Sequence, residues 1–206
     1  EIALWQQLAQ GMGHDRAIRF HGQHNQCSIL WVFATQDGHP HTYAKRRFDF
    51  QQRTAYHDYF VVNTAERGSG ASTNMMANVY RVYSAFGTSR IEMTAGLSDG
   101  ASVWVRYGFQ PASEAAWSAA KATIRTNTDQ LDQSIKDAYT KILGHDIDSA
   151  VEVVLKDPKP EAIFDLWALD PEDKVRIHCN LRFRLPAVLL KGGRWPAFLD
   201  LDGAGG

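Results

Sequence analysis

Residues 66–74, with the sequence ERGSGASTN, have the composition of a loop that binds phosphate. Two glycines and several small side chains leave the backbone accessible, and an amphipathic helix is predicted directly after them. Free backbone N–H groups and the helix dipole attract phosphate at such a helix N-terminus. The loop lacks the lysine of a Walker loop and the GxGxxG spacing of a dinucleotide-binding fold. The segment therefore predicts a phosphate site of another kind.

Three side chains on the strands predicted before and after this helix could transfer protons: His57 and Asp58 on the first strand, and Glu92 on the second. Glu92 lies in an otherwise apolar strand, where burial would raise its pKa toward that of a general base. Two plainer interpretations stay open. Glu92 could face solvent beside a salt partner, and His57 and Asp58 could form a polar pair at a strand edge.

Other arrangements of reactive side chains predict less. The H-x-x-H-x-x-C spacing of residues 21–27 offers three zinc ligands, but no fourth ligand is evident, so no metal is expected. His178 and Cys179 are adjacent on a predicted strand and would point to opposite faces, so they cannot act together as nucleophile and base. Ser69 lacks the G-x-S-x-G pattern of hydrolases.

The helix after the loop is predicted over residues 72–86, and Gly87 is suited to end it. Along it, apolar side chains repeat every three or four residues and would form one buried stripe: Met76, Val79, Tyr80, Tyr83 and Phe86. Alternation and aromatic or β-branched content predict strands over residues 27–34, 41–50, 56–63 and 90–96.

The remaining chain is predicted to be mostly helical until its last part. A seven-residue apolar repeat over residues 117–142 predicts one or two helices, whose apolar face either packs on the sheet or forms an oligomer seam. Further elements are expected over residues 3–12 (helix), 99–109 (short helix, then strand or turn), 150–155 (strand or helix), 160–169 (helix), and 175–185 with 187–201 (a strand pair turning at Gly192-Gly193).

Composition is that of a globular protein, with 206 residues, 44% hydrophobic and 22% charged, enough for one domain with an appended subdomain. The formal net charge of −1 offers no long-range basic field to nucleic acid. The basic run Lys45, Arg46 and Arg47 is expected to be one edge of a solvated strand. No apolar run is long enough for a membrane span, so no membrane partner is expected.

Two cysteines, Cys27 and Cys179, do not make a disulfide framework, and both are expected to be reduced in a cytoplasmic protein. No signal peptide is visible. The chain begins with Glu1 rather than methionine and ends in GAGG, so we expect that it is a fragment of something longer.

A pattern extending over residues 27–111 identifies a family. A Val-rich strand leads to Arg-x-x-Gly-x-small, formed by Arg67, Gly70 and Ser72, and then to the helix ending at Gly87. A strand follows, and after it a helix that ends in Tyr-Gly-Phe at residues 107–109. This order resembles the GNAT superfamily of acyl-CoA-dependent N-acyltransferases.

The resemblance implies an α/β fold: a mixed, mostly antiparallel sheet flanked by helices, with a C-terminal α+β extension. It divides the chain into an acyl-CoA-binding core over residues 1–111 and an extension over 112–206 packed on that core. The co-substrate would be acetyl-CoA or another acyl-CoA, without a metal. The acceptor would be an amine of a protein, peptide, aminoacyl-tRNA or small molecule. No nucleic-acid partner other than tRNA is expected.

The resemblance also assigns roles to residues. The amides of the loop would hold the pyrophosphate, and the end of the preceding strand would run beside the pantetheine arm, between this strand and the splayed strand 90–96. The base would be Glu92, His57 or Asp58. The implied cofactor-binding residues are Val61, Val62, Asn63, Arg67, Gly68, Ser69, Gly70, Ala71, Ser72 and Trp104.

The sequence departs from the family at three positions. Ser72 replaces the usual glycine or alanine at the last loop position, where it could serve as the helix N-cap. At the start of the next helix, where the family often has Asn-x-x-Ala to hold the cofactor, this sequence has Leu97 and Gly100. Trp104 stands where the family places the tyrosine that protonates the leaving thiolate, and an indole cannot donate in this way; Tyr107 is the nearest phenol, but on a helix it would point elsewhere.

Two functions of different kinds therefore stay open. The first is acyl transfer by an N-acyltransferase, acting as a monomer or a homodimer. The alternative is a non-catalytic GNAT-like binding or assembly module of a larger effector, toxin or phage-related protein, as the tryptophan at position 104 would allow. A phosphate-ligand enzyme that shares only the loop is a third and more distant interpretation.

Overall fold

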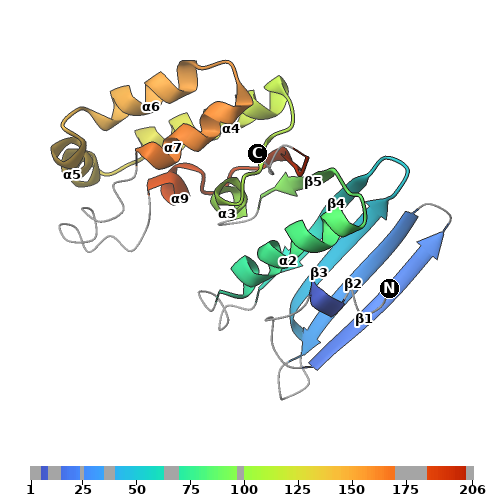
Figure 1. The fold of residues 1–206 in the computed structure, drawn as a ribbon. Helices are drawn as coiled ribbons and strands as arrows, with labels where there is room; N and C mark the ends of the chain where they lie inside the picture. Colours follow the sequence, from blue (N-terminus) through green and yellow to red (C-terminus); the bar gives the residue numbers. More distant parts are fainter. Residues whose placement is uncertain are drawn as a thin grey trace. The chain divides into compact units, whose positions relative to one another are not determined.

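A computed structural model gives the fold (Figure 1), and it describes residues 6–8, 15–23, 26–34, 40–62, 70–96, 100–169 and 185–202. The chain divides into two compact units, the first formed by Glu1–Met93 with Leu199–Gly206 and the second by Thr94–Phe198. The boundary expected at residue 111 is of another kind, because it marks where the resemblance to the family ends. That boundary stays a prediction.

The first unit is built on an antiparallel meander that ends in a parallel strand. Strands β1 to β4 pair antiparallel in chain order, and β5 then pairs parallel with β4. The expected mixed, mostly antiparallel sheet is thus confirmed. The strands of this unit are β1 (Asp15–Gln23), β2 (Gln26–Ala34), β3 (Pro40–Asp49), β4 (Thr54–Val61) and β5 (Arg90–Ala95).

Helix α2 (Ala71–Ala85) connects β4 to β5 and covers one face of the strands before it (Figure 1). The predicted apolar stripe is largely buried, since Met76, Val79 and Tyr83 are each at most 1% exposed. Tyr83 packs edge-on against Phe48 of β3, with ring centroids 5.0 Å apart. After Phe86, Gly87 has a φ of 72° and ends the helix, as predicted.

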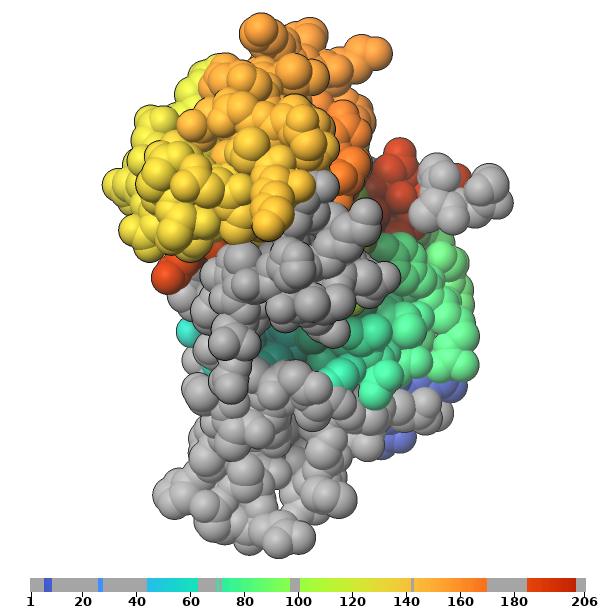
Figure 2. All heavy atoms as spheres, turned by 90° about the vertical axis from the view of Figure 1, so that its left-hand side faces the viewer, coloured from blue at the N-terminus to red at the C-terminus, as the bar shows by residue number. Residues whose placement is uncertain are grey.

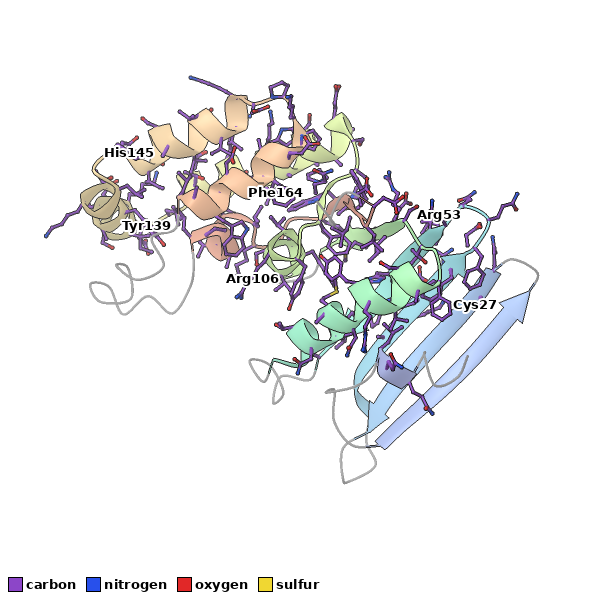
Figure 3. The ribbon with its side chains drawn as sticks, in the orientation of Figure 1. Cys27, Arg53, Arg106, Tyr139, His145 and Phe164 are labelled. Carbon is purple, nitrogen blue, oxygen red and sulfur yellow. The ribbon has the colours of Figure 1, made fainter. Side chains whose placement is uncertain are left out.

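The second unit is mainly helical, and the yellow and orange surface in Figure 2 belongs to its helices. Its core contains Trp117, Ile124 and Tyr139, each at most 2% exposed (Tyr139 is labelled in Figure 3). Its elements are α3 (Gly100–Arg106), β6 (Gln110–Pro111), α4 (Glu114–Asp129), α5 (Gln133–Leu143), α6 (Ile147–Lys156), η2 (Pro160–Phe164), α7 (Asp165–Ala168), α9 (Leu185–Leu189) and β7 (Trp195–Asp200).

The one or two helices predicted over residues 117–142 are two, since α4 ends at Asp129 and α5 begins at Gln133. One prediction for this part of the chain was wrong. The segment predicted as the first half of the strand pair 187–201 lies in helix α9, whereas its second half forms β7 and pairs with β6. The helical alternative for 150–155 is the correct one.

Several expectations concern residues that lie partly or wholly outside the described ranges. The helix expected over 3–12 is seen only at residues 6–8, and the strand expected over 175–185 lies largely outside the described residues, as do His24, His178 and Cys179. Strand β1 was not predicted from the sequence. No helix in the described ranges has both the length and the apolar character needed to cross a bilayer.

Candidate phosphate and proton-transfer site

The backbone of the first unit frames the candidate site at the end of β4. The β4–β5 ladder runs from Thr54–Arg90 to His57–Met93. Strand β4 continues beyond the last of these pairs to Val61, and on its other side it stays paired with β3 as far as Val61–Tyr43. The predicted pantetheine residues Val61 and Val62 lie where this strand ends.

The predicted phosphate loop is only partly described. Asn63, Arg67, Gly68 and Ser69 lie outside the described residues, which resume at Gly70. Gly70 is the N-cap of α2 and has a φ of 84°, a left-handed conformation that favours glycine. Leaving aside its two chain neighbours, a Cβ added to Gly70 would meet no atom of the described residues within 4 Å, so these residues leave the space beside its backbone open.

The first intrahelical hydrogen bond of α2 runs from the Asn74 N–H to the Gly70 carbonyl, at 2.9 Å. Ala71 and Ser72 therefore belong to the first helical turn, where N–H groups lie at the positive end of the helix dipole. The prediction that Ser72 caps the helix was wrong, because the helix begins one residue earlier and no side chain makes the cap hydrogen bond.

His57 is buried between the sheet and α2. Its Nε2 lies 3.0 Å from the hydroxyl oxygen of Tyr83, and the residue is 5% exposed. Burial, followed by the nearby charge of Arg46, holds the pKa of His57 well below 6.5. Burial likewise raises the pKa of Tyr83. At neutral pH the pair therefore consists of an uncharged imidazole and an uncharged phenol.

Arg46 is a functional candidate that the sequence analysis missed. Lys45 and Arg47 are exposed to solvent as predicted, but Arg46 is 1% exposed. The predicted strand edge was also wrong, because β3 is paired with β2 on one side and β4 on the other. Side chains alternate between the faces of a strand, so the middle member of a three-residue basic run must point away from its neighbours. That alternation was the available signal. Burial lowers the pKa of the guanidinium, partly offset by Tyr83.

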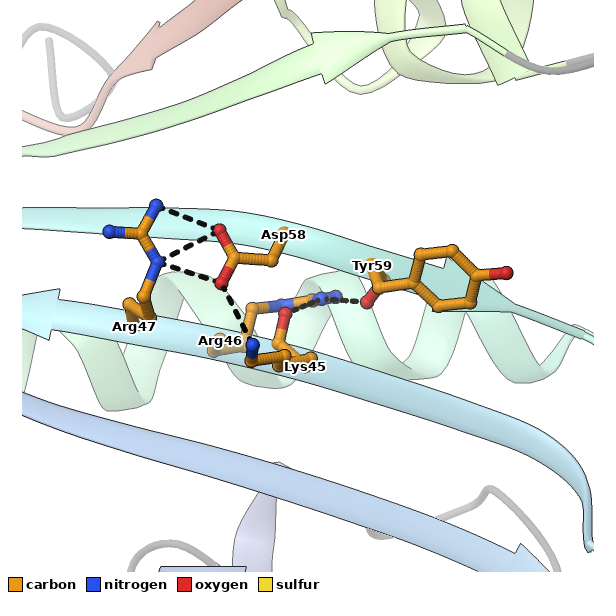
Figure 4. A network of polar contacts seen from close by, with 5 residues as sticks. All are labelled: Lys45, Arg46, Arg47, Asp58 and Tyr59. Carbon is orange, nitrogen blue, oxygen red and sulfur yellow. Dashed lines mark hydrogen bonds and ion pairs between the residues drawn. The ribbon is translucent and has the colours of Figure 1, made fainter. Parts of the chain in front are cut away.

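Asp58 faces away from His57, on the other side of the sheet. Its carboxylate accepts two hydrogen bonds from the Arg47 Nε, at 2.8 and 3.0 Å, and one from Nη2 at 2.9 Å (Figure 4). The Lys45 Nζ lies 3.9 Å away. His57 and Asp58 therefore do not form a joint acid–base pair, and at His57 the strand is paired on both sides rather than at an edge.

Glu92 lies on β5 opposite Tyr56 of β4. It forms an ion pair with Arg90 at 2.9 Å, and both side chains are about 40% exposed. This is a partly solvated carboxylate with a salt partner, the plainer of the two interpretations of the sequence. It keeps access to solvent, which His57 does not.

Trp104 and Tyr107, the other two candidates, lie in the second unit at the end of α3. The Trp104 side chain is 7% exposed and packs edge-on against Phe109, with ring centroids 5.4 Å apart. Tyr107 is half-buried, and its ring centroid is 6.2 Å from that of Trp104. The indole at the position of the expected acid is thus part of an aromatic core.

The described ranges contain no cluster of three or more His, Cys, Asp or Glu side chains that could hold a metal ion. Cys27 is a free, half-buried thiol, and burial raises its pKa. The partner residue His24 of the predicted H-x-x-H-x-x-C set is outside the described residues.

Comparison with solved structures finds acetyltransferases as structural neighbours. Nourseothricin acetyltransferase is 11% identical over 48% of this chain and 71% of its own, with a TM-score of 0.34. An acetyltransferase from Bacillus cereus is 13% identical over 43% and 61%, with a TM-score of 0.36. A GNAT-family acetyltransferase from Staphylococcus aureus is 10% identical over 42% and 55%, with a TM-score of 0.35.

The chain thus spans 55–71% of the length of these three proteins. Likeness at this level does not by itself carry an activity or a substrate to the chain. No family model matches the sequence, and no curated protein does.

Proposed function

We propose that the chain is an acyl-CoA-dependent N-acyltransferase, acting with acetyl-CoA on an amine of a protein, peptide, aminoacyl-tRNA or small molecule. The observation that carries the proposal is the passage from β4 to α2. The helix begins at a left-handed glycine, Gly70, with open space where a side chain would stand. Bare backbone at the positive end of a helix suits the diphosphate of CoA.

The end of β4 supports the same assignment. Beyond the His57–Met93 pair, β4 runs on to Val61 while its other side remains bound to β3. In the proposed complex the pantetheine arm lies along this last part of β4, beside Val61 and Val62. The diphosphate then reaches the loop and the first turn of α2 at Gly70, Ala71 and Ser72, with Asn63, Arg67, Gly68 and Ser69 as the predicted loop contacts.

The reaction is an aminolysis of a thioester. The amine nitrogen attacks the thioester carbonyl carbon, the C–S bond breaks, the nitrogen loses a proton and the CoA thiolate gains one. Glu92 is our candidate for accepting the amine proton, directly or through water, because its carboxylate is partly exposed. His57 and Asp58 are less suited, since the first is buried and the second is held by Arg47.

A non-catalytic CoA-binding or assembly module is the second candidate, and Trp104 favours it. A buried indole packed against Phe109 cannot protonate a leaving thiolate. Tyr107 remains the phenol nearest to position 104 in the sequence. In the acyltransferase the thiolate would therefore leave without help from position 104, whereas a binding module needs no acid at all.

Thermal unfolding in the presence of acetyl-CoA and of desulfo-CoA tests the proposal. A ligand present at about a hundred times its Kd stabilises the folded state by roughly 2.7 kcal/mol. Stabilisation by both compounds, with acetyl transfer to any amine in a panel of peptides and small amines, supports the enzyme. Stabilisation without transfer supports the module. No stabilisation at millimolar acetyl-CoA rejects both.

A further inference from the structure

Strand β4 contains an irregularity beside the candidate site. In the β3–β4 ladder, Lys45 pairs with Tyr59 and Arg46 pairs with His57, so Asp58 is an extra residue on β4. Such a β-bulge bends its strand and increases the local twist, and bulges are common next to functional sites. The bulge therefore sets the direction in which β4 continues to Val61.

The side chain of Arg46 bridges the two strands at this bulge (Figure 4). Its Nη1 donates to the carbonyl of Lys45 on β3 at 2.9 Å and to the carbonyl of Tyr59 on β4 at 2.6 Å. Hydrogen bonds from a charged donor are stronger than those from a neutral one. One nitrogen thus joins Lys45, which flanks the bulge on β3, to Tyr59, the first residue of β4 after the bulge.

The surroundings of Arg46 are mostly apolar, but they include an aromatic ring that favours a cation. Nη2 contacts the Sδ of Met75 at 3.8 Å, and the guanidinium lies over the ring of Phe60, 5.7 Å from its centroid. Burial lowers the pKa of Arg46, and Tyr83 and Asp58 partly offset this; no carboxylate among the described residues forms an ion pair with Arg46, since Asp58 is bound by Arg47 on the opposite face. Burying a cation without a paired carboxylate is costly, and an apolar side chain in its place would leave the carbonyls of Lys45 and Tyr59 without their donor.

We propose that Arg46 is a positioning residue that fixes the bulge at Asp58 and thereby the course of β4 from Tyr59 to Val61. The part of this inference that concerns acyl-CoA rests on the proposed function, since the pantetheine arm is assigned to the same stretch of β4. Arg46 does not touch the acyl group in this proposal. It holds the strand that does.

The test compares Arg46→Met, which keeps the length and packing, with Arg46→Lys, which keeps the charge but has one nitrogen instead of a fork. Arg81→Met is the matched control, because Arg81 is an exposed cation of the same unit that contacts Asn78 on its own helix. Amide hydrogen exchange of residues 58–62 and 26–34, thermal unfolding and the Kd for acetyl-CoA are measured for each variant.

A positioning role predicts that R46M, which leaves the carbonyls of Lys45 and Tyr59 without their donor, unfolds at a lower temperature than the wild type. It also predicts that the amides of residues 58–62 exchange at least tenfold faster, a larger change than at residues 26–34 of β2, as expected for the local loss of a charge-assisted bond. The Kd of R46M for acetyl-CoA rises by about the same factor, with R46K intermediate and R81M unchanged. If R46M does not fold, R46K alone decides, since it must show the faster exchange and the higher Kd in smaller degree.

Two results overturn the inference. One is unchanged exchange at residues 58–62 in the folded variants, which removes the structural basis. The other is faster exchange with an unchanged Kd, which means that the bulge does not serve the ligand. If the wild type binds no acetyl-CoA, the proposed function fails, and the exchange experiment still decides whether Arg46 fixes the bulge.

Discussion

The Nε2 atom of His57 on β4 lies 3.0 Å from the hydroxyl oxygen of Tyr83 on α2, with the two rings nearly perpendicular at 86°. Both residues are buried. This contact is one polar link between the sheet and helix α2 among the described residues. Because both partners are uncharged at neutral pH, the link should fail at either extreme of pH, for opposite reasons.

At acidic pH, the first unit should lose stability through His57. Its pKa in the folded protein is well below 6.5, so the unfolded chain binds a proton before the folded protein does. The free energy of unfolding should fall as the pH drops below about 6.5, with a limiting slope of roughly 1.4 kcal/mol per pH unit. Urea unfolding between pH 7.5 and 5 measures this slope.

His57→Gln should flatten that dependence, since glutamine has no proton to gain. The matched control is His145→Gln, at the exposed turn between α5 and α6 (Figure 3), which should leave the slope unchanged. A slope that persists undiminished in H57Q would show that another group is responsible.

At alkaline pH, Tyr83 should make the free energy of unfolding fall as the pH rises. Burial raises the pKa of Tyr83 in the folded protein above its ordinary value of 10.0, so the unfolded chain loses the phenolic proton first. Stability should be fully present below about pH 10 and should decline as the pH rises above it. Unfolding by urea at pH 9 to 11 measures the decline.

Tyr83→Phe should cost roughly 1 to 3 kcal/mol at pH 7, because the Nε2 of His57 loses its buried partner. The same variant should unfold with less dependence on alkaline pH than the wild type. Tyr59→Phe, at a tyrosine that is 42% exposed, is the control and should change neither quantity by more than a few tenths of a kcal/mol.

Substitutions of two glycines at opposite ends of α2 can distinguish the effect of backbone strain from an effect on ligand binding. Gly70 has a φ of 84° and Gly87 a φ of 72°, and a Cβ at either would meet no atom of the described residues within 4 Å. Alanine at either position should therefore cost about 1 kcal/mol of stability, from the left-handed backbone alone. Only Gly70→Ala should weaken binding of acetyl-CoA, because its Cβ would occupy the space assigned to the diphosphate.

Thermal unfolding of both variants, with and without acetyl-CoA, tests this prediction. If Gly70→Ala and Gly87→Ala lose ligand-induced stabilisation equally, the weaker binding of acetyl-CoA results from general destabilisation and not from the backbone at Gly70. Retention of the full stabilisation in Gly70→Ala would argue against the diphosphate site at α2.

Sequence periodicity was enough to predict α2 and the strands around it, because the apolar residues there repeat with the spacing of the element that buries them. Met76, Val79 and Tyr83 face β3 and β4 as the 3.6-residue period requires. The order strand, loop, helix, strand then follows, and so does the place of Gly70. Local pattern and tertiary packing agree in this part of the chain.

Other features depend on contacts that no local pattern contains. The hydrogen bond that Arg46 donates to the carbonyl of Tyr59, thirteen positions along the chain, depends on the bulge at Asp58. Helix α9 begins an apolar stretch that was predicted to be a strand, but Leu185 and Leu189 are both buried, so packing decided its form. The role of the loop residues from Asn63 to Ser69 remains a prediction.

The cap of α4 offers a stability test in the second unit. The Ser113 hydroxyl oxygen accepts a hydrogen bond from the Ala116 N–H at 3.1 Å. Ser113→Ala should lower the free energy of unfolding by about 1 kcal/mol, as for other N-cap serines. Ser118→Ala, at an exposed site inside the same helix, should instead be neutral or slightly stabilising. Chemical unfolding monitored by circular dichroism compares them, and equal effects would exclude a capping role for Ser113.

Position 104 distinguishes the two candidate functions. Trp104→Tyr places a phenol at the position where the sequence resemblance expects the acid of the GNAT superfamily, and a general acid contributes roughly 10² or more to a rate when it is well placed. Trp104→Phe is the matched control, because it shortens the ring in the same way without supplying a proton. If the chain is an acyltransferase whose thiolate leaves unaided, kcat for acetyl transfer should be higher in W104Y than in W104F.

Both substitutions remove volume from the aromatic cluster with Phe109 and should destabilise the second unit by a similar amount. The difference in kcat between the two variants is therefore free of the packing effect, and thermal unfolding verifies that they are equally folded. Equal turnover in W104Y and W104F would mean that thiolate protonation does not limit the rate at this position. Absence of turnover in both variants and in the wild type, with CoA still bound, would favour the binding module.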